Sequence, residues 1–169
     1  SGVDIHALHE GARAMDEACT PQDLHENPAA LYALTQYMFF RDGKHISVLM
    51  PYSHDLRGLS DWFCQLWAES LGKKDGLKVQ DVFTGPTPVG SVGVTDQHSV
   101  MQLYQDGPFD KVLTLVEAES TCDDEIPICE GEAEDELSYL AEHSFNDLFG
   151  YELEATRCAL REKNRPNCT

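Results

Sequence analysis

The sequence predicts an α/β fold, a three-layer α/β/α sandwich in which helices cover both faces of a parallel sheet. Residues 46–51 and 111–116 are short apolar runs of the kind that form buried strands. Segments with helical spacing of apolar residues precede, separate and follow these two runs. Isolated strands that alternate with helices favour parallel pairing, because a parallel crossover needs a connection about as long as a helix.

Two amphipathic helices are predicted ahead of the first strand. The first covers residues 4–19, where apolar side chains recur at helical spacing at Ile5, Leu8, Ala12 and Met15. The second begins at Pro28, because proline suits the first helical position and Asn27 before it is a good N-cap. We expect residues 1–43 to form a helical linker and residues 44–169 to form the main domain.

Further helices and loops are predicted within the main domain. Residues 56–71 form the most regular helix, with an apolar stripe made by Leu59, Trp62, Phe63, Leu66 and Trp67. Residues 80–83 are expected to form a short strand and residues 84–93 a loop rich in glycine and proline. Two more helices are predicted, over residues 96–105 and over about 136–163.

The charge of the chain excludes one large class of function. It carries 30 acidic and 12 basic residues, which gives a formal net charge of −18 at pH 7. A general nucleic-acid binder needs a basic surface. Much of the excess lies in residues 123–136, which we expect to form a solvated loop. With no apolar run of about 20 residues and no basic-then-apolar leader, we expect a cytoplasmic protein without membrane or nucleic-acid partners.

Metal and nucleotide sites find no support in the motifs. The six cysteines include no C-x-x-C pair, and the seven histidines show no metal-ligand spacing. We therefore expect reduced thiols and no bound metal, with a Cys122–Cys129 disulfide as the alternative. Residues 85–90 lack the Gly-Lys-Ser/Thr of a phosphate-binding loop, and Gly-x-Gly-x-x-Gly is absent.

One candidate for acid–base chemistry lies near the end of the 56–71 helix. Gln65 and Glu69 are four residues apart and therefore share one face. Trp62 and Trp67 flank them, so we expect the carboxylate to be partly desolvated, as a useful base often is. The alternative is an ordinary surface glutamate.

A second candidate is His98. Thr95 is expected to cap the next helix, which would place His98 at the third helical position. The helix dipole there favours the neutral imidazole, which can accept or donate a proton to a hydroxyl group. The alternative is a histidine that serves only to cap the helix or to satisfy the core.

Two motifs resemble those of a known family. The sequences Glu-Ser-Leu-Gly-Lys at 69–73 and Asp-Gln-His-Ser at 96–99 are similar to the two signatures of the glucose-6-phosphate isomerases. Residues 2–5 resemble the link between that family's two sugar-isomerase (SIS) domains, and residues 137–166 resemble its bacterial members. The resemblance implies the second SIS domain of a bacterial-type enzyme, truncated at its C-terminus, with flavodoxin-like architecture.

This resemblance implies a reaction and roles for the candidate residues. The family interconverts glucose-6-phosphate and fructose-6-phosphate in glycolysis and gluconeogenesis, through a cis-enediol and without a metal or organic cofactor. Glu69 matches the base that moves a proton between C2 and C1, and Gln65 matches a residue that contacts the sugar phosphate. His98 matches the histidine that helps to open the sugar ring in the active site of the other subunit of a homodimer.

Parts of the family's active site have no counterpart in this sequence. The hydroxyls and amides that bind the phosphate, a Gly-Gly-Arg motif and a C-terminal lysine motif are missing. We therefore expect the chain alone to have negligible activity. One alternative function is a non-catalytic SIS module that binds sugar phosphates or mediates assembly. A second, an acidic flavodoxin-like electron carrier, is disfavoured because no phosphate-binding loop follows the first strand.

Overall fold

The computed structural model of the chain describes residues 2–118, 126–128, 138–141 and 143–169. The chain divides into two compact units, Ser1–Gly43 and Lys44–Thr169. The predicted acidic loop, apart from residues 126–128, and the Cys122–Cys129 pair lie outside the described residues. Within the described ranges, none of the helices combines the length and the apolar character that a membrane span needs.

The first unit contains the two predicted helices, α1 (Ile5–Ala18) and α2 (Pro28–Arg41). The Asp4 carboxylate caps α1 by accepting hydrogen bonds from the first free backbone N–H groups. Asn27 caps α2, because its side-chain oxygen accepts from the Ala30 N–H at 2.9 Å. Its amide nitrogen also donates to two carbonyl oxygens of the preceding turn, at 2.7 and 2.9 Å. Both predicted helices are confirmed.

The second unit is built on a parallel sheet. Its strands are β1 (Ile46–Pro51), β2 (Thr87–Gly90), β3 (Lys111–Val116) and β4 (Asn167–Cys168). They lie in the order β2-β1-β3-β4, and every neighbouring pair is parallel. The predicted strands at 46–51 and 111–116 are the two central ones, so the predicted parallel α/β architecture is confirmed.

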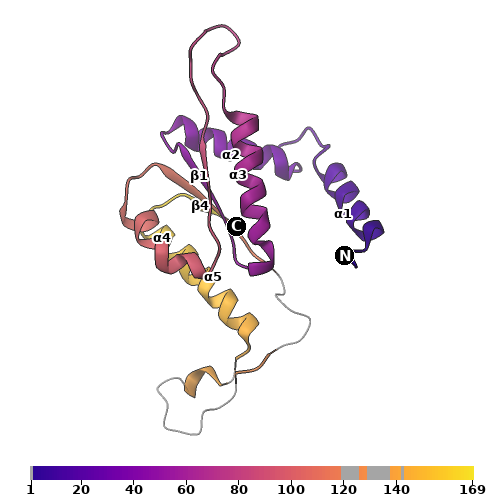
Figure 1. The fold of residues 1–169 in the computed structure, drawn as a ribbon, viewed down its shortest axis with the longest axis vertical. Helices are drawn as coiled ribbons and strands as arrows, with labels where there is room; N and C mark the ends of the chain where they lie inside the picture. The colour runs from indigo at the N-terminus through magenta and orange to yellow at the C-terminus, as the bar shows by residue number, and fades with distance from the viewer. Residues whose placement is uncertain (1, 119–125, 129–137, 142) are drawn as a thin grey trace. The chain divides into compact units, whose positions relative to one another are not determined.

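Helices cover both faces of this sheet (Figure 1). The helices of the unit are a short 3₁₀ turn η1 (His54–Leu56), α3 (Arg57–Leu71), α4 (Thr95–Asp106), a second 3₁₀ turn η2 (Ser138–Leu140) and α5 (Phe145–Glu162). Adjacent residues of a strand point to opposite faces. On β2, a Cβ atom on Gly90 would lie 3.0 Å from Ser60 of α3, whereas Val89 packs on the side of α4 and α5. The three predicted layers are therefore present.

The core lies mainly between the sheet and the pair α4 and α5. One cluster of buried side chains contains Val48, Tyr104, Leu113 and Leu160. A second contains Met50, Tyr52, Leu115 and Leu153. Full burial of each aliphatic side chain contributes about 1.5–3 kcal/mol. The clusters hold α4 and α5 against β1 and β3.

The predicted strand at 80–83 is wrong, and β2 lies in the segment predicted to be a loop. Residues 73–84 instead form a loop that folds back on itself, with Lys73 and Thr84 paired through their backbone groups at 2.8 Å. Asp81 and Phe83 have positive φ angles of 56° and 47°, which a strand excludes. Pro88 lies within β2 and Pro86 just before it, so the segment resembles a loop in the sequence. An edge strand such as β2 nevertheless tolerates residues without an N–H.

Two helix starts also differ from their predictions. Thr95 is the first residue of α4 rather than its cap, and Val94 at the cap position makes no side-chain hydrogen bond. The helix predicted from about residue 136 begins at Phe145. Its boundary is set by a capping box, in which the Ser144 hydroxyl accepts from the Asp147 N–H and the Asp147 carboxylate accepts from the Ser144 N–H.

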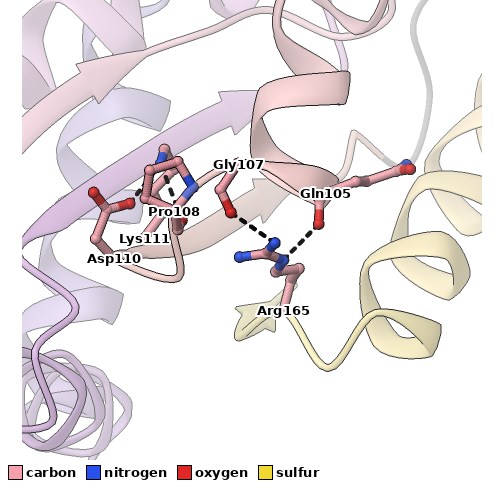
Figure 2. Close-up of polar contacts among 6 residues, drawn as sticks. All are labelled: Gln105, Gly107, Pro108, Asp110, Lys111 and Arg165. Atoms are coloured by element: carbon pink, nitrogen blue, oxygen red, sulfur yellow. Dashed lines mark hydrogen bonds and ion pairs between the residues drawn. The ribbon is translucent and has the colours of Figure 1, made fainter.

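Arg165 ties the end of α4 to the start of β4 (Figure 2). Its Nε donates to the Gln105 carbonyl at 2.6 Å and its Nη2 donates to the Gly107 carbonyl at 2.8 Å. These are carbonyl groups at a helix end, which lack partners inside the helix. The guanidinium carbon also lies 5.0 Å from the centre of the Phe109 ring, and the Lys44 ammonium lies 4.4 Å from the same centre. Arg165 thereby fixes the chain as it enters β4.

The two buried tyrosines of the core predict a loss of stability at high pH. Burial raises the pKa of both Tyr52 and Tyr104, although hydrogen bonds from neighbouring side chains partly oppose this. Above pH of about 10 the unfolded chain releases these protons while the folded chain retains them, so the free energy of unfolding falls as pH rises. Denaturant unfolding between about pH 8 and about pH 11 measures the fall. Tyr104→Phe should show a smaller fall than the unmodified chain, and an equal fall would contradict the prediction.

A second prediction concerns the contact between Gly93 and the ring of Tyr52. A Cβ atom on Gly93 would lie 2.7 Å from three ring atoms, and the ring is buried. We expect Gly93→Ala to lower the free energy of unfolding by about 1–3 kcal/mol, as overpacking does. Gly58→Ala is the control, since Gly58 lies in α3 with nothing near its missing Cβ. Thermal and denaturant unfolding of both variants check the result, and equal stability would disprove the steric argument.

Candidate active site

Gln65 and Glu69 meet on the last turns of α3. The Gln65 Nε2 donates a hydrogen bond to Glu69 Oε1 at 3.3 Å, so the predicted shared face is confirmed. Both side chains are exposed, and Trp62 is 57% exposed. The expected desolvation of Glu69 by the tryptophans is therefore wrong in this chain. Trp67 packs on Phe63, with ring centres 4.8 Å apart.

An open hollow of about 510 Å³ lies beside the end of α3. It is lined by Ala68, by residues 72–74 and by residues 83–88. Lys73 lies in this lining and folds back onto the helix, because its ammonium group donates to the Ser70 carbonyl at 2.6 Å. The hollow thus borders the helix end that carries Glu69, and it is open to solvent.

His98 lies in the first turn of α4 and is exposed. The residues around it point elsewhere. The Asp96 carboxylate accepts from the Val92 N–H at 2.7 Å, and the Ser99 hydroxyl donates to Asp96. The Gln97 amide points into the protein and donates to the hydroxyls of Tyr52 and Thr156, at 2.8 and 2.6 Å.

Glu69 and His98 lie near opposite ends of the strands. The end of α3 is beside the amino end of β2, since a Cβ on Gly85 would lie 2.9 Å from the Leu71 carbonyl oxygen. The start of α4 is beside the carboxyl end of β1, where the Gly93 N–H donates to the Pro51 carbonyl at 2.9 Å. The six residues of β1 separate these two ends, and they span roughly 20 Å. Figure 1 shows the end of α3 and the start of α4 at opposite ends of the strands.

The structure therefore brings Gln65 and Glu69 together but does not bring His98 to them within one chain. In the part of the chain that the structure describes, no group of histidine, cysteine and acidic side chains is arranged to hold a metal ion. Cys19, Cys64, Cys158 and Cys168 carry free thiols.

The sequence motifs did not reveal the contacts of Tyr52 and Thr156 with Gln97. These residues come from three segments that are far apart in the chain, and no local spacing links them. The signal that could have drawn attention to Gln97 is its position directly before His98 in the motif at 96–99.

Comparison with known proteins places this geometry in a family. A family model described as "Phosphoglucose isomerase" matches residues 2–119. The whole chain is 41% identical to a glucose-6-phosphate isomerase of Carboxydothermus hydrogenoformans and 42% identical to one of Rubrobacter xylanophilus. It spans 36% and 37% of the lengths of these two proteins, so it corresponds to about a third of each.

Solved structures agree with the sequence comparison. A hypothetical protein from Thermus thermophilus matches 98% of the chain with a TM-score of 0.90 and 36% identity, over 38% of its own chain. A glucose-6-phosphate isomerase from Chlamydia trachomatis matches 89% of the chain with a TM-score of 0.69, over 28% of its own chain. At 22% identity this second match supports the fold alone. Since the family model covers most of the chain and its relatives align along its full length, the chain belongs to the phosphoglucose isomerase family.

Proposed function

We propose that the longer protein containing this chain interconverts glucose-6-phosphate and fructose-6-phosphate, as the names of its relatives imply. The observation that carries the proposal is the contact between Gln65 and Glu69 on an open surface at the end of α3. A substrate can reach this carboxylate directly. The reaction is a step of glycolysis and gluconeogenesis, so we place the protein in the cytoplasm.

Glu69 is proposed to move the proton. Aldose–ketose conversion removes a proton from C2 of the open-chain sugar and adds one to C1, with a cis-enediol between the two steps. One carboxylate can act as base and then as acid, and a positioned group of this kind contributes about 10²–10⁴-fold to the rate. Because Gln65 donates to Oε1, we assign the proton transfer to Oε2. Gln65 would then orient the carboxylate as well as contact the substrate.

His98 is proposed to open the sugar ring, and its position requires a second copy of the chain. A sugar phosphate is shorter than the roughly 20 Å between the two ends of the strands. One substrate can therefore contact Glu69 and His98 together only if these residues come from different copies. This geometry supports a homodimer in which each active site takes Glu69 from one subunit and His98 from the other.

The rest of the longer protein is proposed to bind the phosphate group. A sugar phosphate is an anion, and a chain with a net charge of −18 repels it. The relatives are nearly three times as long as this chain, which leaves ample sequence for phosphate-binding groups. We infer that this chain alone does not isomerise the substrate.

The first test of this function is Glu69→Gln in the longer protein. We expect the rate of isomerisation to fall at least about 10²-fold, because the amide cannot take the proton, while substrate binding persists. A coupled assay of fructose-6-phosphate conversion measures the rate, and this chain alone, assayed beside it, should show no turnover. Full turnover by the variant would overturn the proposed role of Glu69. Binding of the sugar phosphate without turnover by the unmodified longer protein would favour the alternative of a non-catalytic module.

The second test asks whether the site is shared between subunits. Glu69→Gln and His98→Asn variants should each be inactive, but refolding them together should restore roughly a quarter of the activity of the unmodified protein. Half of the dimers are then mixed, and a two-fold axis gives each of these one intact site. Recovery is measured against each variant refolded alone. Failure to recover, with mixed dimers present, would place both residues in one subunit's site.

A further inference from the structure

Three polar side chains from separate elements meet beneath the start of α4. Tyr52 follows β1, Gln97 is the third residue of α4 and Thr156 lies on α5. The Tyr52 hydroxyl donates to Thr156 Oγ1 at 2.6 Å, and the Gln97 amide donates to both hydroxyls, at 2.8 and 2.6 Å. Tyr52 is 2% exposed and Thr156 is 5% exposed. We call these residues the Tyr52–Gln97–Thr156 cluster.

The cluster fixes the backbone to which His98 is attached. Successive residues of a helix point about 100° apart, so an inward Gln97 leaves His98 directed outward. Val94 packs on the core but supplies no side-chain hydrogen bond at the cap position. The cluster provides hydrogen bonds that join this helix start to the residue after β1 and to α5. The Tyr52–Thr156 hydrogen bond is buried and the two from Gln97 are partly buried. Hydrogen bonds linked in this way inside a protein strengthen one another and define a single arrangement.

We propose that the Tyr52–Gln97–Thr156 cluster positions His98 for ring opening, an inference that rests on the function proposed above. In this step the O1 hydroxyl of the closed sugar loses its proton, the C1–O5 bond breaks and O5 gains a proton. C1 becomes the aldehyde carbon, and no electrons leave the sugar. His98 handles both protons, and the cluster sets the place of its ring without contacting the substrate.

Ring opening can be measured apart from isomerisation. Reclosure of the open sugar on its other face exchanges the two anomers of glucose-6-phosphate, and this exchange does not use Glu69. Exchange spectroscopy by NMR measures it in the complete protein, and the coupled assay measures isomerisation on the same substrate. Glu69→Gln should abolish isomerisation and retain catalysed anomer exchange, whereas His98→Asn should lose catalysed exchange.

The cluster variants are Gln97→Met and Thr156→Val, which preserve size and remove hydrogen bonds. We expect both to lower catalysed anomer exchange about 10–100-fold, as a displacement of a catalytic group by about 1 Å can do. Thr156→Ser, which keeps the hydroxyl, should recover most of the exchange. Tyr104→Phe is the control, because Tyr104 lies on α4 as Gln97 does and its buried hydroxyl, hydrogen-bonded to Ser91 at 2.8 Å, is outside the cluster.

The outcomes separate the two proposals. Unchanged exchange in folded Gln97→Met and Thr156→Val would overturn the positioning role. So would a loss of exchange in Thr156→Ser as large as that in Thr156→Val. A loss in the control Tyr104→Phe as large as in the cluster variants would overturn it too. If either cluster variant does not fold by circular dichroism, Tyr52→Phe, which removes a single hydroxyl, decides the question. A complete protein that catalyses neither exchange nor isomerisation would overturn the proposed function, and the role of the cluster with it.

Discussion

The parallel pairing of β1 with both β2 and β3 determines where the candidate residues Glu69 and His98 lie in this domain. In parallel crossovers each helix must run back along the sheet before the next strand begins. A side chain near the end of a crossover helix therefore lies at the amino ends of the strands. A side chain near the start of the next helix lies at their carboxyl ends. Glu69 and His98 occupy these two kinds of position. Their separation is a property of the topology, and small movements of side chains cannot remove it.

Much of the fold follows from the sequence, because burial leaves a pattern. The two central strands are covered on both faces and read as continuous apolar runs. The edge strand β2 is only partly buried and contains proline, so its residues resemble a loop. The start of α5 depends on a reciprocal pair of hydrogen bonds between Ser144 and Asp147, which periodicity cannot detect. Local capping and edge pairing are weak signals beside the apolar pattern.

The candidate site divides in the same way. Helical spacing was enough to place Gln65 beside Glu69. The expected cap at Thr95 placed His98 near a helix start, but α4 begins at Thr95 itself, so His98 is the fourth helical residue rather than the third. Solvation was predicted wrongly, because the exposure of Trp62 and Glu69 depends on what else packs on α3. The contacts among Tyr52, Gln97 and Thr156 join residues up to 104 positions apart, and no local sequence pattern predicts contacts of this range.

Arg165 gives the domain an order of completion. The carbonyl oxygens of Gln105 and Gly107 receive their partner from a residue 60 and 58 positions later in the chain. Contacts of such long range form slowly, since a large loop must close before they can contribute. During synthesis, the end of α4 thus remains hydrated until the segment around Arg165 leaves the ribosome. The contacts of Arg165 with the end of α4 therefore form late in the synthesis of this domain, after most of its sheet has been translated.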